Sequence, residues 1–191
     1  MPLVFTPQMK KRLSRRARSM LQVALRRFPE LSGKNITVGY THAHLGSSVL
    51  PRHAGSMAKL TIRLKVRKLT YNTIGHELTH LVQGLCQFPP RESRRAATKF
   101  PRGEKQCDIW TLARSELFCD DAPTYLRLPR AVRKKWPRYA EPVRSLCIAA
   151  IKKRQTHRFY IRWLETQIKQ LARKELQRSG APRQLVLPFD D

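Results

Sequence analysis

The stretch Tyr71-Asn72-Thr73-Ile74-Gly75-His76-Glu77-Leu78-Thr79-His80-Leu81-Val82-Gln83-Gly84 contains the pattern H-E-x-x-H. At about 100° per residue, His76 and His80 lie about 40° apart on one face of a helix. The apolar residues fall on the opposite side, namely Ile74, Leu78, Leu81, Val82 and Leu85. The stretch therefore predicts an amphipathic helix whose apolar side packs into the core and whose two imidazoles face outward together.

This pair of histidines has the spacing of a zinc site. Two imidazoles one helical turn apart can bind one Zn²⁺, and the intervening Glu77 can reach a metal-bound water as general base. We therefore predict zinc as the cofactor, with His76 and His80 as ligands and Glu77 as the catalytic residue. The alternative is a pair of histidines that form hydrogen bonds at a helix surface.

A catalytic zinc ion keeps three protein ligands and one open position, so a third ligand is needed. No histidine follows His80 until His157, and the acidic residues considered are few: Glu92, Glu104, Asp108, Glu116, Asp120 and Asp121. The pattern from Glu104 to Phe118 predicts a second helix, on which Glu104 and Asp108 share one polar stripe. Glu104 can ligate the metal while Asp108 accepts the N–H of a ligating histidine. The reverse assignment, with Asp108 as the ligand, stays open.

A strict alternation precedes the histidine motif. In the segment Leu60 to Arg67, apolar and polar residues point to opposite faces, which is the period of a half-buried strand. Its cationic outer face predicts an edge strand. The segment Asn35 to Tyr40 predicts a second short strand. Residues 41–57, rich in Gly, Ser, Pro and His, predict a loop or hairpin.

H-E-L-T-H on one helix followed by E-K-Q-C-D on a second resembles the gluzincin arrangement. The order of helix, alternating strand and H-E-x-x-H helix resembles the SprT-like minimal zinc peptidases, over roughly residues 10–128. The resemblance implies a zincin-like fold, Glu104 as third ligand with Asp108 behind it, and an extended substrate paired with the strand Leu60 to Val66. SprT-like proteins usually complete the site with a third histidine. This chain has none at a suitable spacing, so the acidic ligand is the expected version.

The charge of the chain indicates a polyanionic partner. Its 191 residues include 39 Lys+Arg and 13 Asp+Glu, which leaves a net charge of +26. A compact chain this basic repels itself unless an anion is bound. We predict non-specific phosphate contacts to nucleic acid from the basic helices, through Lys10, Lys11, Arg12, Arg15, Arg16, Arg133, Lys134, Lys135, Lys152, Lys153 and Arg154. The alternative is that these runs are solvated helix faces.

These patterns predict an α+β, zincin-like fold. Its expected parts are an N-terminal helix over Lys10–Arg27, a small mostly antiparallel sheet with an edge strand, the H-E-x-x-H helix, the second ligand-bearing helix, and basic C-terminal helices near 141–154 and 157–178. We expect a zincin-like metallopeptidase domain over residues 1–128, a basic helical extension packed on or beside it over 129–180, and a tail over 181–191.

The four cysteines lack C-x-x-C spacing and are expected to be reduced, mostly buried thiols. No apolar run approaches the roughly 20 residues of a membrane helix, and the first residues lack the apolar run of a secretion signal. We therefore expect a soluble, cytoplasmic protein with no membrane partner.

The leading hypothesis for function is a zinc-dependent metallopeptidase that cleaves nucleic-acid-associated proteins, as SprT-like relatives are thought to do. Glu77 takes the proton of the attacking water, and candidates for stabilising the oxyanion are Tyr125, His42 and His44. A second hypothesis is a nucleic-acid or ribonucleoprotein binding module whose zinc site is structural or vestigial. A third is a zinc hydrolase that acts on something other than peptides.

Overall fold

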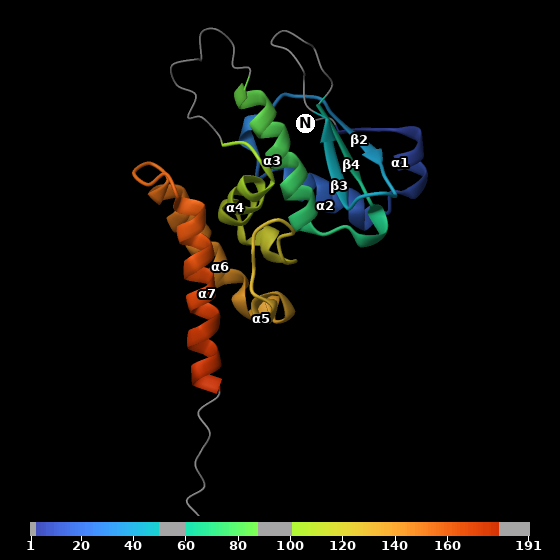
Figure 1. Cartoon of the computed structure of the whole chain (residues 1–191). Helices are drawn as coiled ribbons and strands as arrows, with labels where there is room; N and C mark the ends of the chain where they lie inside the picture. The colour runs from blue at the N-terminus through green and yellow to red at the C-terminus, as the bar shows by residue number, and fades with distance from the viewer. Residues whose placement is uncertain (1–2, 50–59, 88–100, 180–191) are drawn as a thin grey trace, which may run out of the picture.

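The computed structural model describes residues 3–49, 60–87 and 101–179, and within these ranges the chain forms seven α-helices and one four-stranded sheet (Figure 1). The α+β class predicted from the sequence is confirmed. None of the helices in these ranges combines the length and hydrophobicity that a membrane crossing requires. The predicted tail over 181–191 and the candidate ligand Glu92 lie outside the described residues.

The sheet is mixed, with the strand order β1-β2-β4-β3. Strands β1 (Leu3–Phe5), β2 (Ile36–Tyr40) and β4 (Leu60–Leu64) run parallel, and β3 (Gly46–Val49) pairs antiparallel with β4. The predicted mostly antiparallel sheet is therefore wrong. Strand β1 was not expected at all, and helices between β1 and β2 form the long crossover that parallel pairing requires.

Strand β4 lies inside the sheet, between β2 and β3, so its predicted edge position is wrong. Its alternation is as expected, because Leu60, Ile62 and Leu64 are buried and Arg63 is exposed. Alternation indicates which face of a sheet a side chain occupies, whereas the edge position depends on neighbours within the plane. The edge strand beside β4 is β3, which falls in the segment predicted as a loop or hairpin.

The predicted N-terminal helix is in fact two helices, α1 (Pro7–Arg12) and α2 (Arg15–Leu25). The break lies at Ser14, whose backbone is extended and whose hydroxyl accepts the N–H of Ala17 at 3.1 Å. Such a side-chain bond satisfies a donor at the start of a helix, so Ser14 begins α2 rather than continuing α1. Thr6 caps α1 in the same way, through the N–H of Met9.

The remaining helices follow the predicted order with shifted ends. Helix α3 (Tyr71–Gln87) carries the H-E-x-x-H motif, and α4 (Glu104–Arg114) ends before Phe118 because a short 3₁₀ turn over Glu116–Cys119 follows. Three further helices follow within the described residues: α5 (Arg130–Lys134), α6 (Trp136–Lys153) and α7 (Tyr160–Ser179). Helix α6 begins before the expected residue 141 because a proline lies in its first turn, where a missing N–H costs no hydrogen bond.

Two hydrophobic cores organise these elements. The first joins the sheet to α2 and α3, and the second joins α4 to α5, α6 and α7. Ile109 and Leu112 of α4 belong to the second core, while α4 also packs against α3. Helix α6 thus packs on the helix that carries the acidic ligand candidates, and α5 and α7 join the same core. The expected domain boundary near residue 128 stays a prediction.

Asp120 joins the end of the 3₁₀ turn to the start of α3. Its two carboxylate oxygens accept the backbone N–H groups of Tyr71 and Asn72 at 2.7 and 2.8 Å. We expect Asp120→Ala to lower the free energy of unfolding by about 1–2 kcal/mol, because two donors and the positive end of the helix dipole lose their partner. Urea unfolding of the chelator-treated protein, followed by circular dichroism, measures this loss.

The matched control is Asp121→Ala, which removes the neighbouring carboxylate. Asp121 accepts only a local bond from the N–H of Ala122, at 2.8 Å, among the contacts described. This control should change the free energy of unfolding by less than about 0.5 kcal/mol. Equal losses in the two variants would contradict a capping role for Asp120.

Candidate metal centre

Three side chains converge on one point between α3 and α4. The Glu104 Oε2 atom lies 2.9 Å from Nε2 of His76 and 3.1 Å from Nε2 of His80. Ligand atoms around a tetrahedral zinc ion are about 3.3 Å apart, given bonds of about 2.0–2.1 Å. The two imidazole nitrogens and the carboxylate oxygen therefore have nearly the separation that a zinc ion requires, and the donor set fits that metal.

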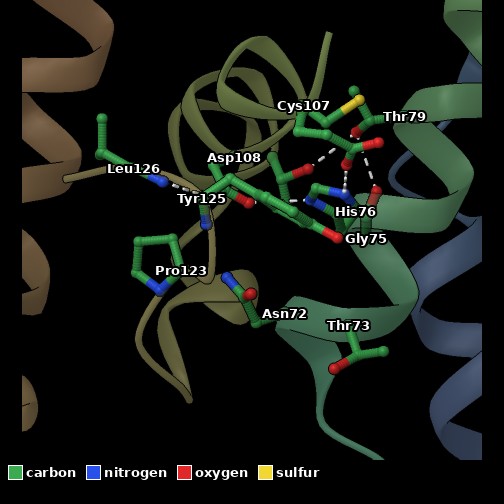
Figure 2. Close-up of polar contacts among 12 residues, drawn as sticks. Asn72, Thr73, Gly75, His76, Thr79, Cys107, Asp108, Pro123, Tyr125 and Leu126 are labelled. Carbon is green, nitrogen blue, oxygen red and sulfur yellow. Dashed lines mark hydrogen bonds and ion pairs between the residues drawn. The ribbon is translucent and has the colours of Figure 1, made fainter. Parts of the chain in front are cut away.

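Asp108 holds the far side of the His76 ring. Its Oδ1 atom accepts the Nδ1–H of His76 at 2.8 Å, and its Oδ2 atom accepts the backbone N–H groups of Tyr125 and Leu126 at 2.6 and 2.7 Å. Figure 2 shows Asp108 between the His76 ring and the Leu126 backbone. Because Nδ1 is occupied by this buried carboxylate, Nε2 is the atom of His76 that faces Glu104.

Gln83 plays the equivalent part for His80. The Oε1 atom of Gln83 lies 3.0 Å from Nδ1 of His80, and its Nε2–H donates to the carbonyl of Pro101 at 2.7 Å. Gln83 is buried, so its amide orients the His80 ring as Asp108 orients the His76 ring. From the sequence alone, Gln83 had no assigned role. Its position three residues after His80 is the signal that indicates this contact.

Negative charge surrounds the two imidazoles and favours a cation at the cluster, either a proton or a metal ion. Burial by itself disfavours a charged His76, but the hydrogen bond to Asp108 and the charges of Asp108 and Glu77 raise the His76 pKa above its usual value. Burial likewise disfavours an ionised Glu104, but its bonds to His76 and His80 lower the Glu104 pKa. Glu104 is therefore a carboxylate at neutral pH, the form that binds a cation. The geometry favours Glu104 over Asp108 as third ligand, although the assignment stays a prediction.

Cys107 is a neighbour of the cluster that sequence reasoning missed. His76, His80 and Cys107 form a group whose possible ligand atoms lie within 4.8 Å of one another. The Cys107 Sγ atom, however, lies 3.1 Å from Nδ1 of His80, on the side of the ring that Gln83 occupies. Burial raises the pKa of this thiol far above its usual value, which keeps it protonated. Cys107 is close enough to be considered as a ligand, but it lies at the opposite ring nitrogen of His80 from Glu104.

Glu77 points from α3 toward the edge strand β3. The hydroxyl of Ser48 donates to the Glu77 carboxylate, and it also lies 3.1 Å from the Glu77 carbonyl oxygen. The side chain is buried, and burial raises the Glu77 pKa above its usual value, although the bond from Ser48 and the nearby histidines oppose this shift. A carboxylate with a raised pKa is better suited to accept a proton near neutral pH.

A cavity of about 240 Å³ opens beside Glu77 and His76. Two of the three residues considered for oxyanion stabilisation line this cavity, namely Tyr125 and His44. The Tyr125 ring stacks on His76, with centroids 5.4 Å apart and planes at 23°, and Figure 2 shows the two rings side by side. Burial and the charges of nearby carboxylates raise the Tyr125 pKa, so its phenol stays a hydrogen-bond donor. His42 lines a different groove.

Gly75 allows α3 to approach α4 and the 3₁₀ turn closely. A Cβ atom at Gly75 would lie 2.6 Å from Cδ1 of Phe118 and 2.7 Å from Cγ2 of Thr111. Both neighbours are buried, and Thr111 also shares a hydrogen bond of 2.8 Å with Thr79 of α3. The residue before the first histidine therefore lets α3 lie close to α4, the helix that carries the candidate ligand Glu104.

The residues predicted to contact nucleic acid lie on separate surfaces. Most are exposed, on α1 and α2 (Lys10, Lys11, Arg12, Arg15, Arg16) and on α5 and the ends of α6 (Arg133, Lys134, Lys135, Lys152), whereas Lys153 and Arg154 are half-buried. The Lys153 ammonium lies 5.3 Å from the ring centroid of Trp163. Figure 1 shows α1 across the sheet from α6 and α7, so the N-terminal and C-terminal basic residues form two surfaces.

Comparison of this chain with protein-family models, with curated proteins and with solved structures finds no match.

Proposed function

We propose that this chain is a zinc-dependent peptidase that cleaves proteins bound to nucleic acid, and that it is a minimal zincin similar to the gluzincins and SprT-like peptidases. The observation that carries the proposal is the shared contact of His76, His80 and Glu104 at 2.9–3.1 Å, next to a buried Glu77 that borders a cavity. The net charge of +26 supports the nucleic-acid part, because it favours a polyanion near the substrate.

In this proposal, His76, His80 and Glu104 would hold a zinc ion, which would supply a Lewis acid for the peptide carbonyl and for the attacking water. Glu77 takes the proton from the attacking water and passes it to the leaving amine. Ser48 orients the Glu77 carboxylate by donating to it. The phenol of Tyr125, which stacks on His76, donates to the oxygen on which negative charge develops.

The proposed place for the substrate is the outer edge of β3. An extended peptide can add a strand to an open sheet edge through backbone hydrogen bonds. The described residues place β4 on one side of β3 and no strand on the other. Strand β3 also carries Ser48, whose hydroxyl donates to Glu77, and Gly46, whose missing side chain leaves room for Glu77. Strand β3 thus replaces Leu60 to Val66, which was expected to pair with substrate.

A second candidate function is a nucleic-acid or ribonucleoprotein binding module with a structural zinc site. The proximity of Cys107 favours it, because a site closed by four protein ligands is typical of structural zinc. The buried Glu77 beside a cavity favours the peptidase, because a structural site has no use for a general base. The third hypothesis, hydrolysis of a non-peptide substrate, uses the same residues.

The test is cleavage of a protein bound to single-stranded DNA by the zinc-loaded chain, with an unstructured peptide as a second substrate. We expect cleavage of both, loss of cleavage after chelation, and recovery when zinc is added back. Stoichiometric zinc without cleavage of either substrate would overturn the peptidase proposal and leave the binding module. Cleavage that persists after complete removal of zinc would contradict the metal-dependent mechanism.

Gly46 gives a direct prediction about the approach of β3 to Glu77. A Cβ atom at Gly46 would lie 2.5 Å from Oε1 of Glu77 and 2.7 Å from its Cγ atom, so the flexible Glu77 side chain would have to move. We expect Gly46→Ala to lower kcat/KM on the unstructured peptide by about 10- to 100-fold, because a catalytic group is displaced. Zinc content should not change.

The matched control is Ser47→Ala on the same strand. Ser47 pairs in register with Arg63, and the alternation of the strand points it to the face opposite Ser48. This variant should keep kcat/KM within about twofold of the wild type, since surface changes away from such contacts are mild. If Gly46→Ala were as active as Ser47→Ala, Glu77 would not need its present position.

A further inference from the structure

A groove of about 1090 Å³ lies between α1 and the ends of the parallel strands, apart from the zinc cluster. It is bordered by Thr6 after β1, Tyr40 at the end of β2, and Arg63 near the end of β4. Ligands of sheets with parallel strands commonly bind beyond the carboxyl ends of those strands. The groove therefore lies where the topology of this sheet favours a ligand.

The groove is lined by cationic side chains from two separate elements and by a histidine from a third. Lys11 and Arg12 come from α1, Arg63 from β4, and His42 from the loop after β2. All four are exposed, and no carboxylate is among the described residues that line the groove. Side chains of like charge that face one another without an acidic partner create a positive potential, which attracts an anion. Phosphate groups are the matching chemistry.

An aromatic ring lies among these cations. The Arg12 guanidinium carbon is 4.4 Å from the centroid of the half-buried Tyr40 ring, which holds Arg12 at the groove. Gly39 lets the stem of Arg63 lie close to β2, because a Cβ atom there would be 3.3 Å from Cγ of Arg63. A concave, cationic surface with an aromatic ring is typical of single-strand binding. Duplex DNA is instead read by elements that protrude into its grooves.

The groove and the zinc cleft share one loop. His42 lines the groove, and His44 and Leu45 line the cavity beside Glu77. The loop is fixed at both ends, because the N–H of Thr41 donates to the carbonyl of Leu64 at 3.2 Å and the N–H of Lys65 donates to the carbonyl of Leu45 at 3.0 Å. A strand in the groove would therefore run beside the proposed peptidase cleft.

We propose that this groove binds the phosphodiester backbone of single-stranded nucleic acid and so holds proteins attached to that strand next to the zinc cleft. Strand binding follows from the groove itself, whereas the delivery of a protein to the cleft rests on the proposed peptidase function. The proposed nucleic-acid contacts therefore include Arg63, His42 and Tyr40, in addition to the basic residues of α1 that the sequence indicated.

The test compares two charge-matched double variants. Lys11→Gln with Arg63→Gln removes two charges from the groove, and Lys34→Gln with Arg26→Gln removes the same two charge types elsewhere on the exposed surface. Binding of a fluorescent oligothymidine and of a duplex of equal length is measured by anisotropy across a salt series, with chelator-treated protein. Matching single-stranded RNA distinguishes the two nucleic acids.

We expect the groove variant to bind the single strand at least tenfold more weakly than the wild type, and the control variant within about threefold. The slope of log affinity against log salt should fall by about 1.4 in the groove variant, since each lost contact with a single strand contributes about 0.7. Equal weakening in both double variants would overturn the proposal, as would a groove variant that loses duplex binding and keeps single-strand binding.

Tyr40→Phe and Tyr40→Leu provide a readout that keeps all charges. The first retains the ring and should retain single-strand affinity, whereas the second should lose about fivefold or more, within the range seen for an aromatic stacking partner. Equal affinities would contradict a role for the ring.

The groove proposal and the peptidase proposal can fail separately. A wild-type chain that binds the strand through the groove and cleaves nothing would overturn the peptidase proposal and leave the groove proposal standing. A groove variant that still cleaves the unstructured peptide but no longer cleaves the DNA-bound protein supports both the groove and the peptidase proposals.

Discussion

The Glu77→Gln variant should lose cleavage of the unstructured peptide by a factor of about 10² to 10⁴ while binding zinc with wild-type stoichiometry. Glutamine has nearly the same shape and can still accept the hydrogen bond that Ser48 donates. Its amide cannot take a proton from water, and this step is what the proposal assigns to Glu77. The measurement pairs kcat/KM with zinc content determined on the same protein preparation.

The control for this variant is Glu116→Gln, which makes the same chemical change at an exposed position of the 3₁₀ turn. Glu116→Gln should keep both activity and zinc. Because Glu77 is buried, thermal unfolding of Glu77→Gln must also resemble that of the wild type before its kinetics are interpreted. A folded, zinc-loaded Glu77→Gln protein with full activity would show that another group acts as the base.

The second large effect is expected on metal affinity. Glu104→Ala removes the oxygen that lies 2.9 and 3.1 Å from the two imidazole nitrogens, so zinc affinity should fall by more than about a hundredfold. Asp108→Asn leaves all three proposed ligands and changes only the partner of His76, so it should weaken zinc by about 10- to 100-fold. Competition with a chromogenic chelator gives both dissociation constants.

The order of these two effects decides between the ligand assignments. If Asp108→Asn lost the metal while Glu104→Ala kept it, Asp108 would be the third ligand. Cys107→Ser is the third arm, because Cys107 is near His80 but on its Nδ1 side. We expect this variant to keep wild-type affinity. A loss as large as that of Glu104→Ala would place sulfur in the ligand set and favour a structural site.

The sequence predicted the helix around His76 well, because its apolar period and its motif indicate opposite faces. The prediction that both imidazoles face outward is wrong for His76, which is buried against α4. It also predicted that Glu104 and Asp108 share a stripe, from their separation of one helical turn. The contacts between α3 and α4 depend on packing, and no local pattern reveals that a Cβ atom at Gly75 would meet Phe118. Which oxygen faces which nitrogen therefore became visible only in three dimensions.

The sheet was predicted less well, because the sequence pattern of β3 is weak and the pattern of β4 does not indicate its neighbours. Strand β3 has the sequence Gly-Ser-Ser-Val, which lacks an alternating apolar pattern, and its Ser48 is fixed by Glu77 rather than by a core. The alternation of β4 identified its faces but could not identify its neighbours. The helix break at Ser14 was missed because basic residues continue on both sides, so the composition does not change where the backbone does.

Helix α4 lies between the two hydrophobic cores and carries a candidate metal ligand. Its apolar residues Ile109 and Leu112 belong to the core of α5 to α7, whereas its Glu104 faces two histidines of α3, a helix whose apolar side belongs to the core of the sheet. An ion bound between α3 and α4 would therefore link the two hydrophobic cores. If zinc binds as proposed, a change in how α4 packs on α6 is therefore expected to change zinc affinity.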